Sequence, residues 1–234
     1  DLVEETLRRG RADPEYELLD TGILEDDRYF DVVVEYAKAG PADLLIRVTA
    51  TNRGLYPAPL HVLPTLWFKN DWSWGDANAR PAITVARDDA NGLVLTAAHR
   101  TLGTYRLHCE APDEVLFTEN ETNAERLFGV ANASPYVKDA LHERVVQGRR
   151  DAVNPARTGT KAAPHYAFPV GGGETVVVRL RLTAAGRLLA EGAVEVAATM
   201  GRLQRELDDL HGEPAGPVSI ATSTQLRLCP FFTG

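Results

Sequence analysis

The sequence has few of the features that mark a disulfide scaffold, a membrane protein or a nucleic-acid-binding protein. Its two cysteines, Cys109 and Cys229, are far apart and match neither metal-site nor disulfide spacing. Free thiols are typical of a reducing compartment, so we expect a cytoplasmic location. No apolar run approaches the roughly 20 residues that cross a bilayer, which predicts no membrane partner. Lys and Arg number 25 against 33 Asp and Glu, and this net charge of −8 argues against nucleic acid as a partner.

Metal-binding and cofactor-binding patterns are also missing. The six histidines include no pair four residues apart, the spacing that would place two metal ligands on one helical face. The run Gly171-Gly172-Gly173 leads into a strand-like segment, so it lacks the helix N-terminus that a phosphate-binding loop requires. We interpret this run as a hairpin turn. The sequence therefore predicts no metal and no organic cofactor.

Alternating apolar and polar residues, typical of strands with one buried face, recur through much of the chain. Residues 29–36 and 44–52 form the clearest pair, and the Gly-Pro turn between them predicts an antiparallel hairpin. Further strands are predicted at residues 60–68, 82–87, 92–98, 104–110, 114–119 and 175–184. Because no strand–helix–strand rhythm is present, the pattern predicts a mainly β protein, an antiparallel β-sandwich.

Helical patterns are confined to two places after the early strands. Ser134 followed by Pro135 resembles an N-cap and a first helical residue, and one short packed helix is predicted from there to Gly148. Apolar residues recur at helical spacing up to Leu210, which predicts a C-terminal amphipathic helix. We therefore divide the chain into a β-sandwich domain at residues 1–186, a helical linker at 187–212 and a poorly ordered tail at 213–234.

All three tryptophans, Trp67, Trp72 and Trp74, lie within eight positions, together with Asn70. Flat rings bind the apolar faces of sugars and an amide can hold hydroxyls, so this segment has the composition of a carbohydrate-binding wall. Trp67 and Phe68 point to opposite faces of a strand, so one of them belongs to the core. Trp72 and Trp74 lie beyond that strand and are better candidates for a surface role. The alternative is packing against a second domain, because Trp is also enriched at interfaces.

A polar segment from residue 149 to about 165 is predicted to be a long loop, and it concentrates basic residues. Its first two residues are Arg149 and Arg150, whose guanidinium groups can hold a carboxylate or sugar hydroxyls. The alternative, which we favour, is a loop that ion pairs tie to the acidic surface of the protein.

Paired carboxylates are the residues that glycoside hydrolysis needs on the two sides of the scissile bond. Each pair in this sequence lies in a turn-like segment, where acidic residues are commonly solvated or capping. The pairs are Asp26 with Asp27, Asp71 with Asp76, and Glu119 with Glu121. None of these residues is assigned a catalytic role.

Five long segments are distinctive enough to compare with known families: DPEYELLDTG, DRYFDVVVEYAKAGPADLLIRVTATNRG, APLHVLPTLWFKNDWSWG, LFTENETNAERLFG and ASPYVKDALHERVVQGRRDAVNPARTGTKAAPHY. Together they resemble the N-terminal region of bacterial glucosidases related to glycoside hydrolase family 63, the processing α-glucosidase I type. The resemblance runs with few gaps from about Leu2 to Ala184. It fades beyond Gly186, and the tail from Pro214 onward matches nothing in that family.

The resemblance implies that this chain is one part of a larger enzyme. Family members pair an N-terminal β-sandwich of the super-sandwich type with a C-terminal (α/α)6 barrel. The acid and base that hydrolyse an α-glucosidic oligosaccharide belong to the barrel. The chain would then be N-terminally incomplete, inactive alone and partnered by the barrel. The candidates for a sugar-site border or a domain interface are Trp67, Asn70, Trp72, Trp74, Arg149 and Arg150.

Two alternatives stay open beside this interpretation. The chain can be a free-standing carbohydrate-binding module that uses the loop of Trp72 and Trp74. It can also be an enzyme in its own right, if an assembly supplies Asp71 or Glu119 across an interface.

Overall fold

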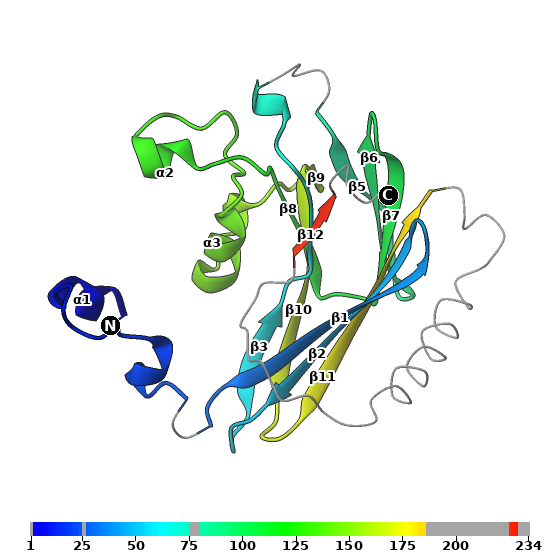
Figure 1. Cartoon of the computed structure of the whole chain (residues 1–234). Helices are drawn as coiled ribbons and strands as arrows, with labels where there is room; N and C mark the ends of the chain where they lie inside the picture. Colours follow the sequence, from blue (N-terminus) through cyan, green and yellow to red (C-terminus); the bar gives the residue numbers. More distant parts are fainter. Residues whose placement is uncertain (1, 25–26, 75–79, 186–224, 229–234) are drawn as a thin grey trace.

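The structure is a computed structural model, and it describes residues 2–24, 27–74, 80–185 and 225–228. Two β-sheets form the body of the described chain, and a few short helices lie beside them (Figure 1). The predicted mainly β fold, an antiparallel β-sandwich, is therefore confirmed.

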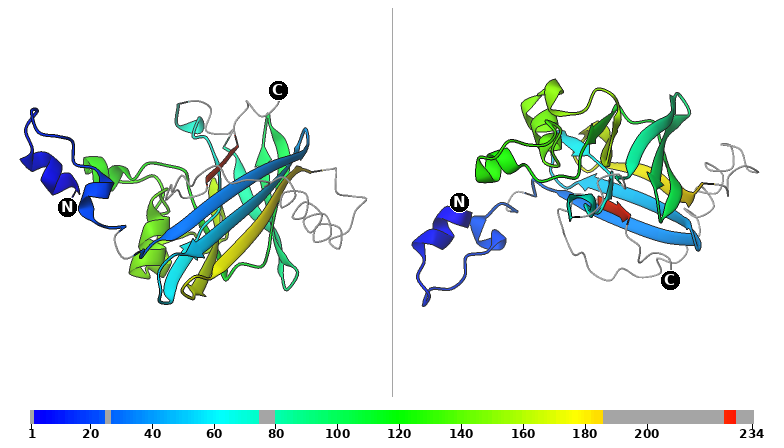
Figure 2. Two further views of the ribbon diagram at one scale, coloured as in Figure 1. Left: turned by 60° about the horizontal axis from the view of Figure 1, so that its bottom comes forward. Right: turned by 90° about the horizontal axis from the view of Figure 1, so that it is seen from above.

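The larger sheet has seven strands in the order β1-β2-β11-β7-β6-β5-β9, and every neighbouring pair is antiparallel. Its strands are β1 (Phe30–Gly40), β2 (Asp43–Asn52), β5 (Ala82–Asp89), β6 (Gly92–His99), β7 (Gly103–Cys109), β9 (Thr158–Gly159) and β11 (Thr175–Ala184). The predicted hairpin of β1 and β2 is confirmed, and Figure 2 shows these two strands beside β11.

The smaller sheet is built around one central strand, β10. Its strands are β3 (Ala58–Val62), β4 (Thr65–Phe68), β8 (Glu114–Thr118), β10 (Lys161–Val170) and β12 (Gln225–Leu228). Strands β3, β4 and β8 all pair antiparallel with β10, whereas β12 runs parallel to β4. The sequence predicted one strand over residues 60–68, but the structure breaks it at Leu63 and Pro64. Proline has no N–H for the ladder, and the Thr65 hydroxyl donates to the Leu63 carbonyl at 2.9 Å.

The core lies between the two sheets, and both of them contribute side chains to it. The larger sheet supplies Ile46, Val48, Leu95, Leu107 and Leu180, and the smaller sheet supplies Leu66, Phe68, Phe117 and Tyr166. Each such apolar side chain contributes about 1.5–3 kcal/mol when it is fully buried. Phe68 is 1% exposed, so it is the core member of the pair that it forms with Trp67.

The predicted loop over residues 149–165 is wrong for its second half. Residues 158–159 form β9 and β10 begins at Lys161, so the central strand of the smaller sheet lies where a loop was expected. Strand β10 is buried on both faces over Ala162–Tyr166 and contains Pro164. A strand buried on both faces shows no polar–apolar alternation, which is why the period-2 pattern failed here.

The predicted hairpin turn at Gly171–Gly173 is also wrong in one respect. The turn does join β10 to β11, and Gly173 has a φ of 73°, a left-handed conformation that suits glycine. However, β10 belongs to the smaller sheet and β11 to the larger one. The turn therefore carries the chain from one layer to the other.

The predicted packed helix is present but begins later than expected. It is α3 (Ala140–Gln147), with Asp139 at the N-cap position, and it ends at Gly148, which has a φ of 71°. The Ser134 hydroxyl instead accepts the Tyr136 N–H at 3.2 Å in a local turn. A short helix α2 (Ala124–Phe128) was not predicted.

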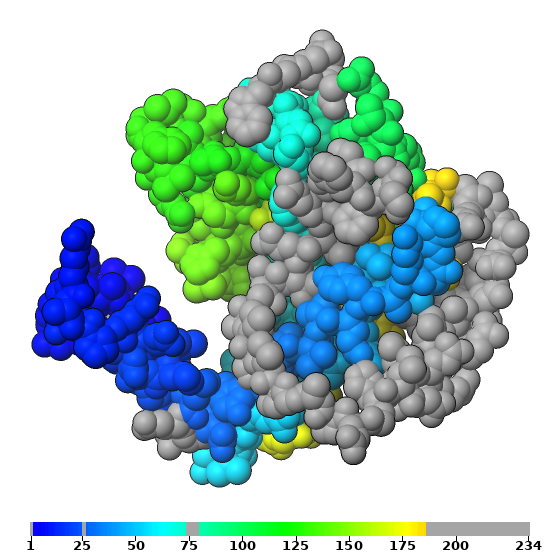
Figure 3. Space-filling view, viewed as in Figure 1, coloured from blue at the N-terminus to red at the C-terminus, as the bar shows by residue number. Residues whose placement is uncertain are grey.

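The first described residues form an arm that stands off from the sandwich, as the space-filling view shows (Figure 3). The arm contains α1 (Leu2–Arg8) and a 3₁₀ turn η1 (Leu18–Thr21), and neither has a buried residue. Its exposed large apolar side chains are Val3, Leu7, Leu18, Leu19, Ile23 and Leu24. Several apolar side chains in one exposed segment are typical of a surface that another molecule or domain covers.

The predicted C-terminal helix and the linker at residues 187–212 lie outside the described residues. The same holds for most of the tail at residues 213–234. Within that tail, residues 225–228 form β12, so these four residues have regular structure where none was expected.

One half-buried histidine on the larger sheet gives a pH-dependence prediction. Burial, followed by the charges of Arg181, Arg87 and Arg106, lowers the pKa of His108 to about 4. The unfolded chain takes up the proton at an ordinary pKa of about 6.5, so stability is present above pH 6.5 and is lost as the pH falls toward 4. Because His108 is partly solvated, we expect a loss of only about 1–2 kcal/mol.

The measurement is the urea midpoint of unfolding at several pH values between 4 and 7. His108→Gln is expected to flatten the profile in this window, whereas the exposed His142→Gln is expected to leave it unchanged. An equally steep profile in His108→Gln would contradict the assignment.

Candidate functional site

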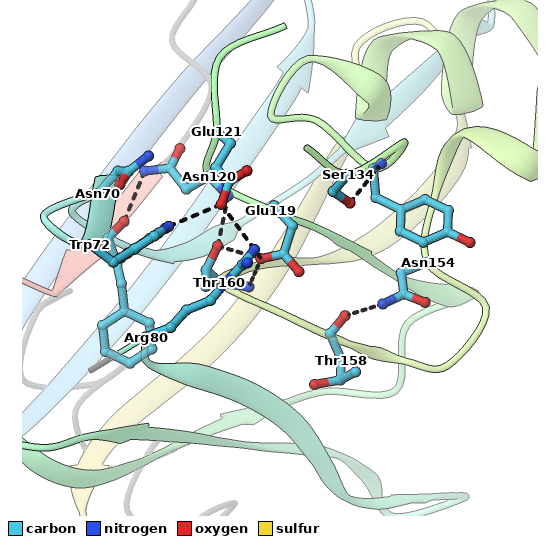
Figure 4. A network of polar contacts seen from close by, with 12 residues as sticks. Asn70, Trp72, Arg80, Glu119, Asn120, Glu121, Ser134, Asn154, Thr158 and Thr160 are labelled. Atoms are coloured by element: carbon cyan, nitrogen blue, oxygen red, sulfur yellow. Dashed lines mark hydrogen bonds and ion pairs between the residues drawn. The ribbon is translucent and has the colours of Figure 1, made fainter. Parts of the chain in front are cut away.

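The site lies where three loops meet at one end of the smaller sheet (Figure 4). The loop after β4 supplies Trp72, from the 3₁₀ turn η2 (Trp72–Trp74). The segment after β8 supplies Glu119 and Glu121, and the link between β9 and β10 supplies Thr160. Arg80 precedes β5. We call these five residues the Trp72 cluster.

Glu119 is the most fully bonded member of the cluster. Its Oε2 accepts the Thr160 N–H at 3.0 Å and the Thr160 hydroxyl at 2.8 Å. The same oxygen lies 2.6 Å from Arg80 Nη2, and the Glu119 side chain is only 14% exposed. A largely buried carboxylate with three donors is held in one orientation.

Glu121 connects the same arginine to the tryptophan. Its Oε1 lies 3.0 Å from Arg80 Nη2 and accepts the Trp72 Nε1–H at 3.0 Å. The Arg80 guanidinium carbon also lies over the Trp72 ring, 5.8 Å from its centroid, within the range of a cation–π contact. Trp72 is half-buried against the core. The ring is therefore fixed both by its polar edge and by one face.

Two asparagines hold the loops around the cluster. Asn70 Oδ1 accepts the Ser73 N–H at 3.2 Å and the Ser73 hydroxyl at 2.8 Å, which orders the turn that carries Trp72. Asn120 donates from Nδ2 to the Phe68 carbonyl at 2.8 Å, and its N–H donates to the Thr160 hydroxyl at 2.7 Å. The three loops are thus joined by short polar contacts and not only by apolar packing.

This arrangement is unsuited to acid–base hydrolysis of a glycosidic bond. That chemistry needs two carboxyl groups with the glycosidic oxygen between them. Here one guanidinium nitrogen contacts both Glu119 and Glu121 and occupies that position. A guanidinium remains protonated in proteins, so it offers no acid or base of its own. The cluster can brace loops, or present its outer edge to a second domain or a ligand.

The other predicted site residues are distributed differently. Trp67 is half-buried on the opposite face of β4 from Phe68, and it pairs with Lys161 of β10. Arg149 Nη1 lies 2.6 Å from Glu143 Oε2, as the favoured ion-pair interpretation of that segment predicts. Arg150 is exposed in η4 (Arg150–Ala152). Among described residues, no hydrogen bond or ion pair joins either arginine to the Trp72 cluster. The side chain of Trp74 lies outside the described part of the structure.

Sequence reasoning missed Arg80 and the joint role of the two glutamates. Glu119 and Glu121 were noted only as one of three acidic pairs, and Arg80 was not singled out. The sequence signal for Arg80 was its position as a basic residue just after the tryptophan segment, in a chain with a net charge of −8. Three of the five distinctive sequence segments, those that contain Trp72, Glu119 and Thr160, meet in this cluster.

Removal of the Glu119 carboxylate should destabilise the protein measurably. Glu119→Ala leaves the Thr160 N–H and hydroxyl without their acceptor and removes one of the two carboxylates that contact Arg80, which we expect to cost about 2–3 kcal/mol of unfolding free energy. Urea denaturation followed by tryptophan fluorescence measures this change. Asp71→Ala is the control, because Asp71 is exposed and its ion pair among the described residues is a surface pair with Lys69, and it should cost less than about 0.5 kcal/mol. Equal effects of the two substitutions would contradict the bracing role.

The described residues contain neither a cluster of metal ligands nor a membrane-spanning helix. No group of three His, Cys, Asp or Glu side chains in these ranges is placed to hold a metal ion. Of the helices that the structure describes, none is long and apolar enough to span a bilayer.

The chain is similar in sequence to a yeast protein. No protein-family profile matches the chain. The chain is 33% identical over 215 residues to the uncharacterized protein YMR196W of Saccharomyces cerevisiae. The matched region is 78% of this chain but 20% of the yeast protein. The chain spans about a fifth of the length of the relative it matches. The relative's name states no activity.

Proposed function

We propose that this chain is the non-catalytic N-terminal β-sandwich portion of a glucosidase-like glycoside hydrolase. In this proposal the sandwich supports a helical (α/α)6 barrel, and the barrel hydrolyses α-glucosidic bonds in an oligosaccharide. The Trp72 cluster then borders the sugar site or seals the interface between the two domains. The proposed activity and the proposed barrel partner both rest on the resemblance of the sequence to family 63 glucosidases.

The observation that carries the proposal is the bridging of Glu119 and Glu121 by Arg80. An acidic pair bridged by one guanidinium, beside a fixed tryptophan edge, is suited to positioning and packing, and it leaves bond cleavage to residues elsewhere. The exposed apolar side chains of the arm at residues 2–24 agree with a second domain that covers them. The length of the yeast relative agrees with further domains in proteins that carry this region.

The proposal is tested by comparing the chain alone with a longer protein that contains the sandwich and the region that follows it. Activity on 4-nitrophenyl α-glucoside is expected only in the longer protein. There Trp72→Ala is expected to reduce kcat/KM at least about tenfold, which corresponds to roughly 1.4 kcal/mol of lost transition-state stabilisation. Tyr56→Ala, at an exposed position outside the cluster, is the control and should leave the activity unchanged. Hydrolysis by the chain alone, or an inactive longer protein that is correctly folded, would contradict the proposal.

A direct measurement of sugar binding by the isolated chain distinguishes our proposal from the alternative of a free-standing carbohydrate-binding module. A module should bind maltotriose unaided and lose that binding in Trp72→Ala, as measured by isothermal titration calorimetry. Our proposal expects no such binding by the isolated chain. The Trp72 ring, half-buried with one face under Arg80, is less open than a sugar-binding wall requires.

A further inference from the structure

Four side chains form a line across the outer face of the smaller sheet, apart from the Trp72 cluster. Arg144 of α3 donates to Glu114 Oε2 at 2.7 Å, and Glu114 Oε1 lies 3.0 Å from His165 Nδ1. His165 Nε2 lies 2.8 Å from His61 Nδ1, and the two rings are inclined by 29°. The line thus runs from α3 through β8 and β10 to β3, elements that lie side by side in Figure 1.

The chemistry of the four groups fixes the order of the protons along this line. Glu114 already accepts from Arg144, so its carboxylate is the acceptor for His165 Nδ1–H. In a neutral imidazole the other nitrogen, His165 Nε2, then carries no proton. It accepts a hydrogen bond from His61 Nδ1–H. His61 Nε2 is left as an acceptor at the end of the line. It has no partner among the described residues, and His61 is exposed while His165 is buried.

A hollow of about 340 Å³ begins at this histidine. Its walls are otherwise apolar, and they consist of Pro57, Ala58, Pro59, Leu60, Ala167, Phe168 and Pro169. Proline and phenylalanine side chains present rigid flat surfaces that suit a ring. None of these wall residues is charged, so a charged ligand would lose solvation without gaining a partner. A neutral ligand with a hydrogen-bond donor fits both the walls and His61.

We propose that this hollow binds a small neutral ring that carries a hydroxyl group, which donates a hydrogen bond to His61 Nε2. His165, Glu114 and Arg144 act as positioning residues, because they fix the tautomer of His61 and keep its free nitrogen an acceptor. Both a phenol, such as a tyrosine side chain, and a pyranose sugar have this shared chemistry. The inference does not rest on the proposed glucosidase role, and it concerns a different end of the smaller sheet.

The first test concerns the protein without ligand. Nitrogen-15 NMR of the histidine rings should show His61 protonated at Nδ1 and unprotonated at Nε2 near neutral pH. If His61 carries its proton at Nε2, the free nitrogen is a donor and the proposal is overturned. This test needs no substitution, so it does not depend on the folding of a variant.

The second test is a titration of the same signals with p-cresol, methyl α-glucoside and toluene. At least one hydroxylated ring should shift the His61 signals, with a Kd of roughly 1–10 mM for so small a ligand. The compound that binds identifies the source of the hydroxyl. Toluene has the ring of p-cresol without the hydroxyl and should bind at least tenfold more weakly than p-cresol if p-cresol binds. Absence of a shift with both hydroxylated rings, or equal binding of toluene and p-cresol, would overturn the proposal.

Substitutions separate a binding role from a purely structural one. His61→Phe keeps a ring of similar size but removes the acceptor. It should raise the Kd of the hydroxylated ring that binds at least tenfold. His142→Phe, at an exposed position of α3, makes the same change outside the hollow and should leave the Kd unchanged. Unchanged affinity in His61→Phe would show that the line of side chains only attaches α3 to the sheet, and would overturn the proposal.

Discussion

Phe68→Ala is expected to lower the free energy of unfolding by about 3–5 kcal/mol. Phe68 is 1% exposed and lies in the core between the sheets, where its ring stacks with His99 at 5.5 Å between centroids. Truncation removes its buried area and leaves a cavity, because both sheets are held by their own hydrogen bonds and cannot close around the gap. Phe68 also ends β4 and accepts a hydrogen bond from Asn120, so the loop of Trp72 should loosen as well.

The measurement is urea denaturation, with tryptophan emission as the probe of the loop. Phe128→Ala is the matched control, because Phe128 of α2 is 71% exposed and the chemical change is the same. The control should cost less than about 0.5 kcal/mol. If both variants unfold at the same urea concentration, the assignment of Phe68 to the core is wrong.

Gly159→Ala is expected to cost about 2–3 kcal/mol by overpacking. A Cβ at residue 159 would lie closer than 3.0 Å to the Thr118 carbonyl oxygen, and real Cβ atoms do not approach that near. The obstructing atom is backbone at the end of β8, so no side chain can rotate away. Thr160 follows directly and donates to Glu119, so a shift at residue 159 should also disturb the Trp72 cluster.

Gly10→Ala serves as the control for this substitution. The nearest atom to a Cβ there is Asp13 Oδ2 at 3.6 Å, an ordinary contact, so the stability should change by less than about 0.5 kcal/mol. Thermal unfolding of the two variants beside the original protein gives the comparison. A melting temperature of Gly159→Ala within error of the original would mean that the chain relaxes at this point, against the expectation.

Local sequence pattern predicted those strands that have one buried and one exposed face. In β2 every second side chain is buried from Ile46 to Asn52, and in β11 Val178 and Leu180 are buried between half-buried neighbours, so alternation was visible without any knowledge of the neighbouring strands. The same pattern failed for β10, which has covered faces on both sides over Ala162–Tyr166. It also failed at Pro64, where one run of apolar residues is shared between β3 and β4.

The candidate site was predicted only in part. The tryptophan segment drew attention through its composition, and Trp72 does lie in a cluster of polar contacts. Its partner Arg80 carried no motif of its own, because a single arginine in a loop is compatible with many roles. The assignment to a family 63 glucosidase, the oligosaccharide partner and the helical barrel stay predictions, which the experiments above test.

The sequence by itself determined that this chain is mainly β, where its clearest hairpin lies and that a helix ends at Gly148, since each depends on neighbouring residues and their backbone preferences. Only the tertiary structure decided that Arg80 bridges Glu119 and Glu121 and that His61 meets His165. The physical reason is distance along the chain. These partners are between 39 and 104 residues apart, and which of them meet depends on the order of strands in the two sheets, which no local pattern encodes.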